Sequence, residues 1–150
     1  MKNHKPYCYD YPRHAVAADI IVLTKKESRL HILLIKRKNY PFAGKFAFPG
    51  GFVDPGESTD EAAARELKEE TAVSSDALQQ FRVYSEAGRD PRGRIISVVY
   101  SVFIEELTEY AAGDDAAEAQ LFDIEKLPAL AFDHNKILAE YFEENSPIQL

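Results

Sequence analysis

The most constraining feature of this sequence is a predicted helix that carries three glutamates on one face. Glu66, Glu69 and Glu70 are three and four residues apart, so a helix places their side chains next to one another. Like charges at these spacings repel by about 0.2–0.5 kcal/mol per pair, and anions near a helix C-terminus are disfavoured further. A divalent cation would turn this repulsion into coordination, and carboxylate oxygens suit Mg²⁺ or Mn²⁺. The pattern indicates a metal-binding face, although these three residues alone leave open an ordinary solvated acidic surface.

The residues before the glutamates predict a loop that leads into this helix. Residues 46–48 are apolar and suit a short buried strand, which Pro49-Gly50-Gly51 should end. Adjacent glycines also let other groups approach the main chain closely. Ser58 and Glu61 match a capping box, which predicts a helix from about residue 59 to residue 71 or 72. One side of this helix should pack on a sheet through Ala63, Ala64, Leu67 and Thr71.

Residues 51–73 resemble the signature of the Nudix family, G-x5-E-x7-R-E-U-x-E-E-x-G-U, in which U is aliphatic. The chain supplies Gly51, Glu57 and the run Arg65-Glu66-Leu67-Lys68-Glu69-Glu70, and it departs from the pattern only at Ala72, where the family has glycine. A residue at this place commonly takes a left-handed conformation at the helix end. We therefore expect Ala72 either to cost roughly 1 kcal/mol of stability or to shift the cap toward Ser74, without abolishing activity.

The resemblance implies a role for each charged residue of the signature. Nudix carboxylates hold two or three Mg²⁺ or Mn²⁺ ions, so Glu66, Glu69 and Glu70 are the expected metal ligands and catalytic residues. The family also implies a main-chain carbonyl ligand, which by position is that of Gly50. Arg65 is expected to orient a neighbouring glutamate through a salt bridge.

A further acidic group of the site usually comes from outside the signature in this family. Glu118, which precedes a predicted strand, is our first candidate for a late metal ligand or general base. Asp114 and Asp115 compete with it, and all three could instead belong to a polar loop. Glu57 is expected either to support the water shell of the metal or to fasten the loop to the helix.

Two basic clusters are candidates for binding the phosphates of a substrate. Arg37 lies at the end of a predicted strand, and a guanidinium can form two parallel hydrogen bonds to a phosphate. Arg89, Arg92 and Arg94 lie in the connection between two other predicted strands. The alternative for each cluster is an ordinary solvated turn.

The whole chain, residues 1–150, is expected to form a single α/β (α+β) domain. Asp133 should be the N-cap of a closing helix, and we expect the adjacent His134 to be structural. Strands interrupted by one central and one terminal helix predict a mixed sheet with helices on both faces, and the Nudix resemblance implies the same α/β/α sandwich. The longer predicted strands are residues 15–24, 30–36, 81–86, 95–104 and 119–124.

Composition limits the partners of the protein. A formal net charge of −7 argues against a surface that binds nucleic acid, but it does not exclude a small phosphorylated ligand bound with cations. No apolar run approaches the roughly 18 residues of a membrane-spanning helix. The N-terminus lacks the apolar core of a signal peptide, and Cys8 is the one cysteine. We expect a cytoplasmic protein that binds neither nucleic acid nor membranes.

Beyond the signature, the chain resembles the bacterial ADP-ribose pyrophosphatases of the family. A proline downstream of the signature, here Pro91, is associated with ADP-ribose substrates. The resemblance implies a small nucleotide substrate, hydrolysis of ADP-ribose to AMP and ribose 5-phosphate, and assembly into a homodimer. The segments that carry this resemblance are residues 11–13, 34–38, 48–54, 88–94 and 131–134.

Two alternatives to this activity remain open. Another nucleotide pyrophosphohydrolase, acting on nucleoside triphosphates or sugar nucleotides, would use the same signature. A non-catalytic nucleotide sensor, as found in some transcription regulators that resemble this branch, belongs to a different class. The intact pairs Arg65-Glu66 and Glu69-Glu70, and a chain that ends at Leu150 soon after the closing helix, favour the enzyme.

Overall fold

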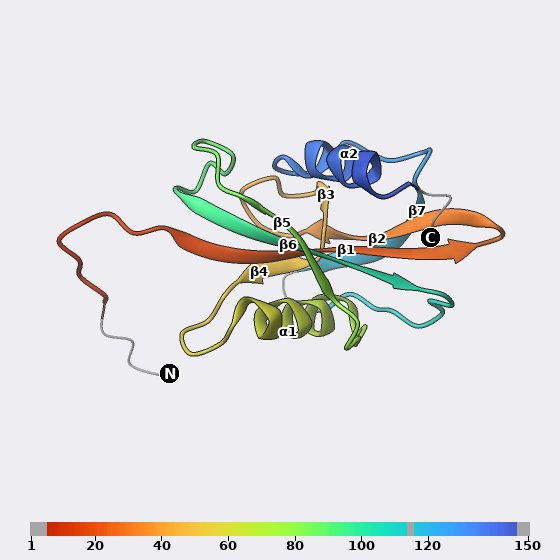
Figure 1. Ribbon diagram of the computed structural model, residues 1–150, viewed down its shortest axis with the longest axis horizontal. Helices are drawn as coiled ribbons and strands as arrows, with labels where there is room; N and C mark the ends of the chain where they lie inside the picture. The colour runs from red at the N-terminus through yellow and green to blue at the C-terminus, as the bar shows by residue number, and fades with distance from the viewer. Residues whose placement is uncertain (1–5, 114–115, 147–150) are drawn as a thin grey trace.

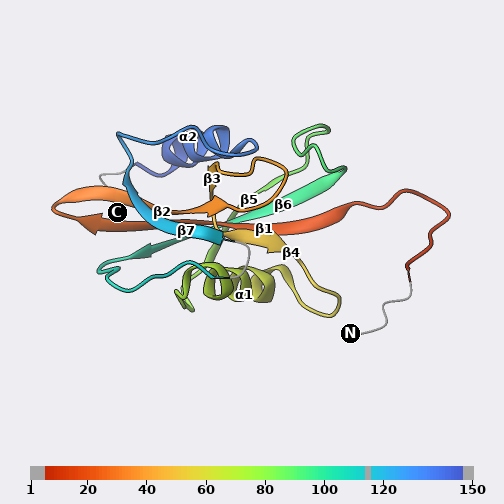
Figure 2. The same cartoon turned by 180° about the vertical axis from the view of Figure 1, so that it is seen from behind.

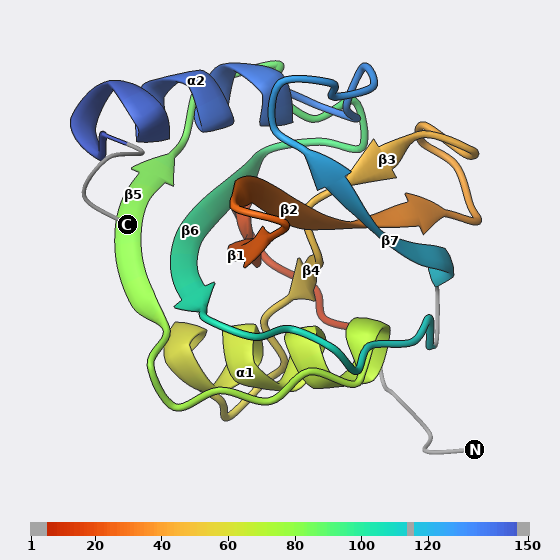
Figure 3. The same cartoon turned by 90° about the vertical axis from the view of Figure 1, so that its right-hand side faces the viewer.

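The computed structural model describes residues 6–113 and 116–146, in which one seven-stranded sheet lies between two helices (Figure 1). The helices cover opposite faces of the sheet, and Figure 3 shows the three layers. No helix in the described part of the chain is both long and apolar enough to cross a membrane. The elements are β1 (Ala15–Lys26), β2 (Arg29–Arg37), β3 (Phe46–Ala47), β4 (Gly50–Phe52), α1 (Thr59–Thr71), β5 (Gln79–Tyr84), β6 (Ile95–Ile104), β7 (Ala116–Asp123) and α2 (His134–Glu144).

The sheet is mixed, as predicted. Strands β3, β2, β1, β6 and β5 follow one another across it, and β1 runs parallel to β6 in a register from Ala15 opposite Ile95 to Thr24 opposite Ile104. The remaining pairs are antiparallel: β4 pairs with β1, and β7 lies along β2 (Figure 2). The expected α/β/α sandwich is confirmed.

The alternation of side chains along β1 divides the core into two parts. Ile20 points to the face covered by α1, whereas Ile21 points to the face covered by α2. Helix α1 contributes Ala62, Ala63 and Leu67 to its side of the core. The expectation that Ala64 packs on the sheet is wrong, because the residue is exposed while Ala62 is buried.

Both ends of α1 have the expected geometry. The Ser58 hydroxyl accepts a hydrogen bond from the Glu61 amide (3.1 Å), and the Glu61 carboxylate accepts one from the Ser58 amide (2.7 Å). At the other end, Ala72 has a φ of 61°, and its amide donates to the Lys68 carbonyl at 2.9 Å. The predicted left-handed residue is therefore present, in a conformation that a Cβ disfavours.

Replacing Ala72 with glycine should stabilise the protein. Because the backbone is already left-handed, we expect Ala72→Gly to raise the free energy of unfolding by about 1 kcal/mol. The turnover rate should stay within about twofold of the original, since Ala72 presents no metal-binding atom. Urea unfolding followed by circular dichroism measures the first quantity. A large gain in turnover without a change in stability would contradict the assignment.

The structure differs from the prediction at β4. The sequence predicted that the short strand of residues 46–48 would end at Pro49-Gly50-Gly51. Gly50 and Gly51 instead lie inside β4 and pair with Asp19 and Ala18 of β1. A Cβ on Gly50 would lie 2.3 Å from the Ala18 carbonyl oxygen, so the two strands approach this closely only because the side chain is absent. The pair of glycines makes a strand here rather than ending one.

Candidate active site

The three glutamates of α1 do not have equal surroundings. Glu66 and Glu70 line a cleft beside β4, whereas Glu69 is more exposed. Glu70 is the most buried of the three, with 6% of its surface accessible, and its carboxylate accepts a hydrogen bond from the Gly50 amide at 2.9 Å. The predicted acidic face is therefore present, with two of its members directed into a cavity.

Burial changes the acidity of the two cleft glutamates. Desolvation raises the pKa of Glu70 to about 8, and the nearby charges of Glu66 and Asp19 add to the shift while the Gly50 amide opposes it. Desolvation also raises the pKa of Glu66, against the opposing effect of Arg65. Ionising the two carboxylates is unfavourable here unless a cation accompanies them.

Arg65 joins the helix to the loop before it. Its guanidinium donates to both oxygens of Glu57 (2.5 and 3.0 Å), to Glu66 (2.7 Å) and to Glu69 (3.0 Å). A further bond reaches the Phe52 carbonyl at 3.0 Å. Arg65 is thus in salt-bridge contact with its neighbouring glutamate, as the resemblance implied. Hydrogen bonds from Arg65 lower the pKa of Glu57 to about 2, which fits the fastening role that was one of its two predicted roles.

Glycines bring the backbone close to these carboxylates. A Cβ on Gly51 would lie 2.5 Å from the Glu66 carboxylate carbon, so β4 can pass the helix only without a side chain. Gly113 has a similar place at the end of α1, where a Cβ would lie 2.2 Å from the Glu69 carbonyl oxygen. The Gly113 amide donates to the Glu70 carbonyl at 3.2 Å, which satisfies a carbonyl of the last helical turn.

The donors of the site suit a divalent cation chemically. Clustered carboxylate oxygens are the ligands that Mg²⁺ and Mn²⁺ prefer, and a cation would compensate the buried charge of Glu70. Among the described residues, however, no three acidic, histidine or cysteine side chains are gathered around one point. Arg65 binds both Glu66 and Glu69, so coordination by all three glutamates requires these side chains to shift.

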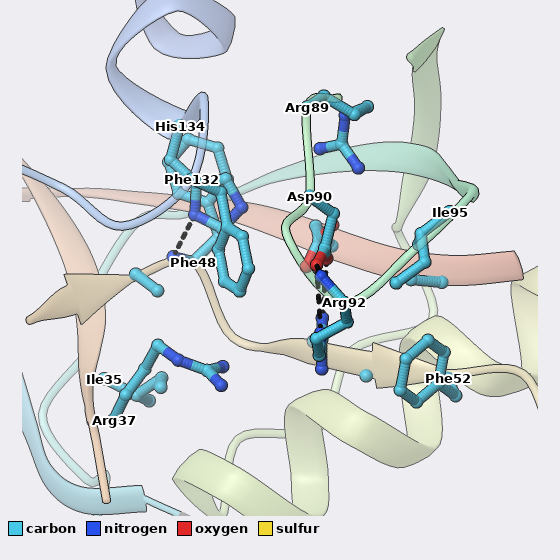
Figure 4. Close-up of a pocket in the computed structure, with 15 residues that line it drawn as sticks. Ile35, Arg37, Phe48, Phe52, Arg89, Asp90, Arg92, Ile95, Phe132 and His134 are labelled. Carbon is cyan, nitrogen blue, oxygen red and sulfur yellow. Dashed lines mark hydrogen bonds and ion pairs between the residues drawn. The ribbon is translucent and has the colours of Figure 1, made fainter. Parts of the chain in front are cut away.

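Arg37 and Arg92 line the same cleft as Glu66 and Glu70. Figure 4 shows the two arginines in the adjoining part of the cleft, which they also line. Arg37 uses its Nε to donate to the Pro41 carbonyl at 2.7 Å, and among the described residues its two Nη groups have no hydrogen-bond partner. The Arg92 guanidinium is held by both oxygens of Asp90, at 3.1 and 2.8 Å. Both guanidiniums lie over the ring of Phe132, at 4.9 and 5.2 Å.

The two arginines form a place for an anion. The pKa of Arg37 is lowered, first by burial and then by the positive charge of Arg92. Like charges that approach one another in a half-buried cleft favour an anionic ligand between them, because it would relieve both the repulsion and the desolvation. Both arginines line the cleft, and their contact with a substrate stays a prediction.

The other two predicted substrate residues have different surroundings. Arg89 borders the cavity, but its side chain is 5% accessible and binds both oxygens of Asp133 at 2.9 and 2.7 Å. Asp133 is the N-cap of α2, as expected, yet its side chain makes no cap hydrogen bond and binds Arg89 instead. Arg94 is exposed outside the cleft, and its carbonyl accepts a bond from Ala15. Contact of Arg89 or Arg94 with a substrate stays a prediction.

Glu118 lies on β7 and is not among the residues that line the cleft. It stands opposite Lys36 of β2, and the two side chains form an ion pair at 3.3 Å. Its predicted role as a late metal ligand or base stays a prediction, which would require this ion pair to open. The competing candidates Asp114 and Asp115 lie outside the described residues.

Several cleft residues were not identified as site residues from the sequence. They include Asp19, Asp90, Phe52 and Phe132, and His134 was expected to have only a structural role. Asp19 could have been identified from the sequence, because it is the one charged residue in the mostly apolar stretch 15–24 and a charge in a buried strand indicates a site. The others lie in loops or at element ends, where no periodicity indicates which way a side chain points.

The fold and the acidic helix place this chain in a known family. The model of the NUDIX domain matches residues 13–143, which is most of the sequence. The chain belongs to the Nudix family of hydrolases, and the resemblance identified in residues 51–73 is confirmed.

Individual members of the family are similar to this chain over most of its length. The chain is 50% identical over 141 residues to an ADP-ribose pyrophosphatase of Methanocaldococcus jannaschii, covering 94% of this chain and 78% of the relative. It is 33% identical over 137 residues to the ADPR responsive transcriptional repressor NtrR of Acinetobacter baylyi, covering 89% of this chain but only 55% of the repressor. Among solved structures, the NUDIX domain of Shewanella oneidensis NrtR complexed with ADP ribose aligns with a TM-score of 0.83 and 26% identity, over 95% of this chain and 94% of that domain.

Proposed function

We propose that the protein hydrolyses ADP-ribose to AMP and ribose 5-phosphate with the help of Mg²⁺ or Mn²⁺. The observation that carries this proposal is a single cleft that combines the carboxylates of Glu66 and Glu70 with the Arg37 guanidinium. A pyrophosphate needs both a cation-binding side and donors for its oxygens. The identity to an ADP-ribose pyrophosphatase and the likeness to a domain that binds ADP ribose support this substrate.

The carboxylates would hold the metal. Glu66, Glu69 and Glu70 would supply oxygen ligands, together with the main-chain carbonyl of Gly50, and Glu118 is the candidate for a further ligand or base. A bound divalent ion supplies a lowered water pKa and neutralises phosphate charge. Arg65 would position Glu66 and Glu69, since it already contacts both.

The arginine side of the cleft would hold the substrate. The Nη groups of Arg37, which have no hydrogen-bond partner among the described residues, can donate two hydrogen bonds to one phosphate. Arg92 adds a second positive charge whose direction Asp90 fixes. With the phosphates held between these arginines and the acidic helix, the scissile bond would lie next to the carboxylates. Charge-assisted bonds of this kind each contribute about 1.5–3 kcal/mol.

A panel of phosphate compounds tests the proposed function. Purified protein should release AMP from ADP-ribose in the presence of Mg²⁺ or Mn²⁺, and EDTA should stop the reaction. Nucleoside triphosphates, dinucleotides and sugar nucleotides, measured by chromatography of the products, should have a kcat/KM at least about tenfold lower. If a nucleoside triphosphate were hydrolysed faster than ADP-ribose, the proposed substrate would be wrong, but the proposed metal-dependent hydrolysis would stand. Tight ADP-ribose binding without turnover would favour a sensor, the class to which the repressor relative belongs.

Two further expectations also stay predictions of this proposal. A homodimer is implied only by the family resemblance. A cytoplasmic location is implied only by the polar N-terminus, the single cysteine and the short apolar runs of the sequence. Light scattering after size-exclusion chromatography would decide the first, and localisation of the tagged full-length protein would decide the second.

A further inference from the structure

His134 places one fixed hydrogen-bond donor at the inner end of the cleft. The side chain is 3% accessible, and its Nδ1 accepts a hydrogen bond from the Phe48 amide at 3.1 Å (Figure 4). An amide can only donate, so Nδ1 carries no proton and Nε2 carries it in the neutral ring that burial favours. Among the described residues Nε2 has no partner, yet no fully buried polar side-chain atom there lacks one. The Nε2–H group therefore reaches the surface of the cavity that His134 lines.

Asp19 places an acceptor in the same cavity. One of its carboxylate oxygens, Oδ2, accepts a short hydrogen bond from the Ser97 hydroxyl. The other oxygen, Oδ1, has no partner among the described residues, and it lies beside Gly50, where a Cβ would be 2.5 Å from it. Asp19 is half-buried in β1, so this oxygen is directed into the cavity rather than into open solvent.

The aromatic rings at this end of the cleft have little free face. The His134 ring stacks on Phe48 with centroids 4.3 Å apart and 7° between the planes. The ring centroids of Phe132 and His134 are 5.5 Å apart, and the guanidiniums of Arg37 and Arg92 lie over the Phe132 ring. A purine would need an open aromatic face in addition to polar partners. Of the exposed rings of the cleft, Tyr40 borders only its outer part, whereas Phe52 borders both parts and has the Arg92 guanidinium over its ring at 4.8 Å.

We propose that the inner end of the cleft is a subsite for the vicinal hydroxyl groups of a small sugar, with Asp19 as the acceptor and His134 as the donor. One hydroxyl donates to Asp19 Oδ1, and its neighbour accepts from His134 Nε2–H. Carboxylates recognise ribose hydroxyl groups in the same manner in other nucleotide-binding folds. The inference rests on the proposed function and refines it: the subsite takes the terminal ribose of ADP-ribose, and the adenosine lies toward the outer part of the cleft, which Tyr40 borders.

The position of Asp19 connects this subsite to the acidic helix. A Cβ on Gly50 would lie 2.5 Å from Asp19 Oδ1, and the Gly50 amide donates a hydrogen bond to the Glu70 carboxylate. A ribose held by Asp19 therefore has its 5-phosphate close to both Glu70 and Arg37. The linked group, rather than the base, is selected by the innermost residues of the cleft.

Binding of the separated products tests this inference without requiring turnover. Isothermal titration calorimetry with Mg²⁺ would measure the Kd of ribose 5-phosphate, 2-deoxyribose 5-phosphate and AMP. The original protein should bind ribose 5-phosphate about tenfold or more tightly than the 2-deoxy compound. Asp19→Asn and His134→Gln should each bring this ratio close to one, while the Kd of AMP changes by less than about twofold.

Matched controls separate these effects from changes in the fold. Asp123→Asn and His31→Gln remove the same groups from the distant end of β7 and β2, and both should keep the original ratio. Thermal unfolding of each variant monitors folding. Should His134→Gln unfold, Asp19→Asn still carries the test, because an asparagine oxygen can accept from Ser97.

Several results would overturn the inference. One is a loss of AMP binding with an unchanged sugar ratio, which would place the adenosine at the inner end. Another is a variant Asp19→Asn that weakens Mn²⁺ binding and keeps the ratio, which would make Asp19 a metal ligand. Absence of ribose 5-phosphate binding by the original protein would overturn it as well. A protein that discriminates the sugars but fails to hydrolyse ADP-ribose would refute the proposed function and leave the subsite standing.

Discussion

Glu70→Gln should lower ADP-ribose hydrolysis by about 10²-fold or more and stabilise the metal-free protein at the same time. The loss of activity follows from the removal of a charged ligand from the cleft, while the shape of the side chain stays the same. Glutamine also keeps an oxygen that can accept the hydrogen bond from the Gly50 amide, now 2.9 Å from Glu70. The variant should therefore fold normally.

The gain in stability follows from the pKa of Glu70. Burial raises this pKa to about 8 in the folded protein from an ordinary value of 4.5. Below pH 4.5 the group is protonated in both states and contributes no pH dependence. Between pH 4.5 and 8 the unfolded chain loses the proton while the folded protein retains it, so the metal-free protein becomes less stable as the pH rises. A neutral glutamine removes this effect, which is on the order of 4 kcal/mol at pH 8.

Urea unfolding in EDTA at pH 5 and pH 8 would measure this pH dependence. The original protein should lose more stability between the two pH values than Glu70→Gln does, and added Mg²⁺ should restore stability only where the carboxylate is present. Glu143→Gln, which removes an exposed carboxylate from α2, is the control and should behave as the original protein. Full hydrolytic activity in Glu70→Gln would refute the metal assignment.

Helix α1 shows which parts of the fold could be predicted from the sequence. Its boundaries depend on Ser58 and Glu61, which interact across one helical turn, and the structure has both hydrogen bonds. The left-handed Ala72 was predictable for the same reason, because a helix end is a local feature. Strand β6 was also predicted with its observed bounds, since a long β-branched and aromatic run leaves little ambiguity.

The residues that were missed depend on contacts between distant parts of the chain. Phe48 and His134 are 86 positions apart, and the hydrogen bond between them exists only once α2 has packed on the sheet. The rotation of α1 that buries Ala62 rather than Ala64 is likewise set by the sheet it covers. The sequence predicts the end of a strand at Gly50 and Gly51, because glycines favour turns. In the structure both residues belong to β4, where close contact with β1 and α1 requires glycine.

Gly51→Ala should reduce activity by about 10²-fold while leaving most of the fold intact. A Cβ at this position would lie 2.5 Å from the Glu66 carboxylate carbon, a distance that real contacts do not reach. The far end of the Glu66 side chain can move away, so the expected loss of unfolding free energy is only about 1–2 kcal/mol. Its carboxylate, however, would leave both the cleft and the 2.7 Å hydrogen bond with Arg65.

Gly50→Ala is the matched comparison, and we expect its main effect to be a loss of stability rather than a displaced catalytic side chain. A Cβ there would lie 2.3 Å from the Ala18 carbonyl oxygen and 2.8 Å from the Asp19 Cα, both of which belong to the backbone of β1. Because neither can move without opening the sheet, we expect a loss of about 3 kcal/mol or more in the free energy of unfolding. Urea unfolding of both variants would distinguish the two cases.

A double-mutant cycle tests whether Gly51 acts through Glu66. If the methyl group only displaces this carboxylate, Gly51→Ala should have little further effect on kcat/KM in a protein that already carries Glu66→Gln. The Mn²⁺ affinity should follow the same pattern, falling in each single variant and little more in the double variant. Additive losses would mean that Gly51 serves the reaction independently, through backbone contact with the substrate. Gly51 would then be required for substrate access rather than for the position of a ligand.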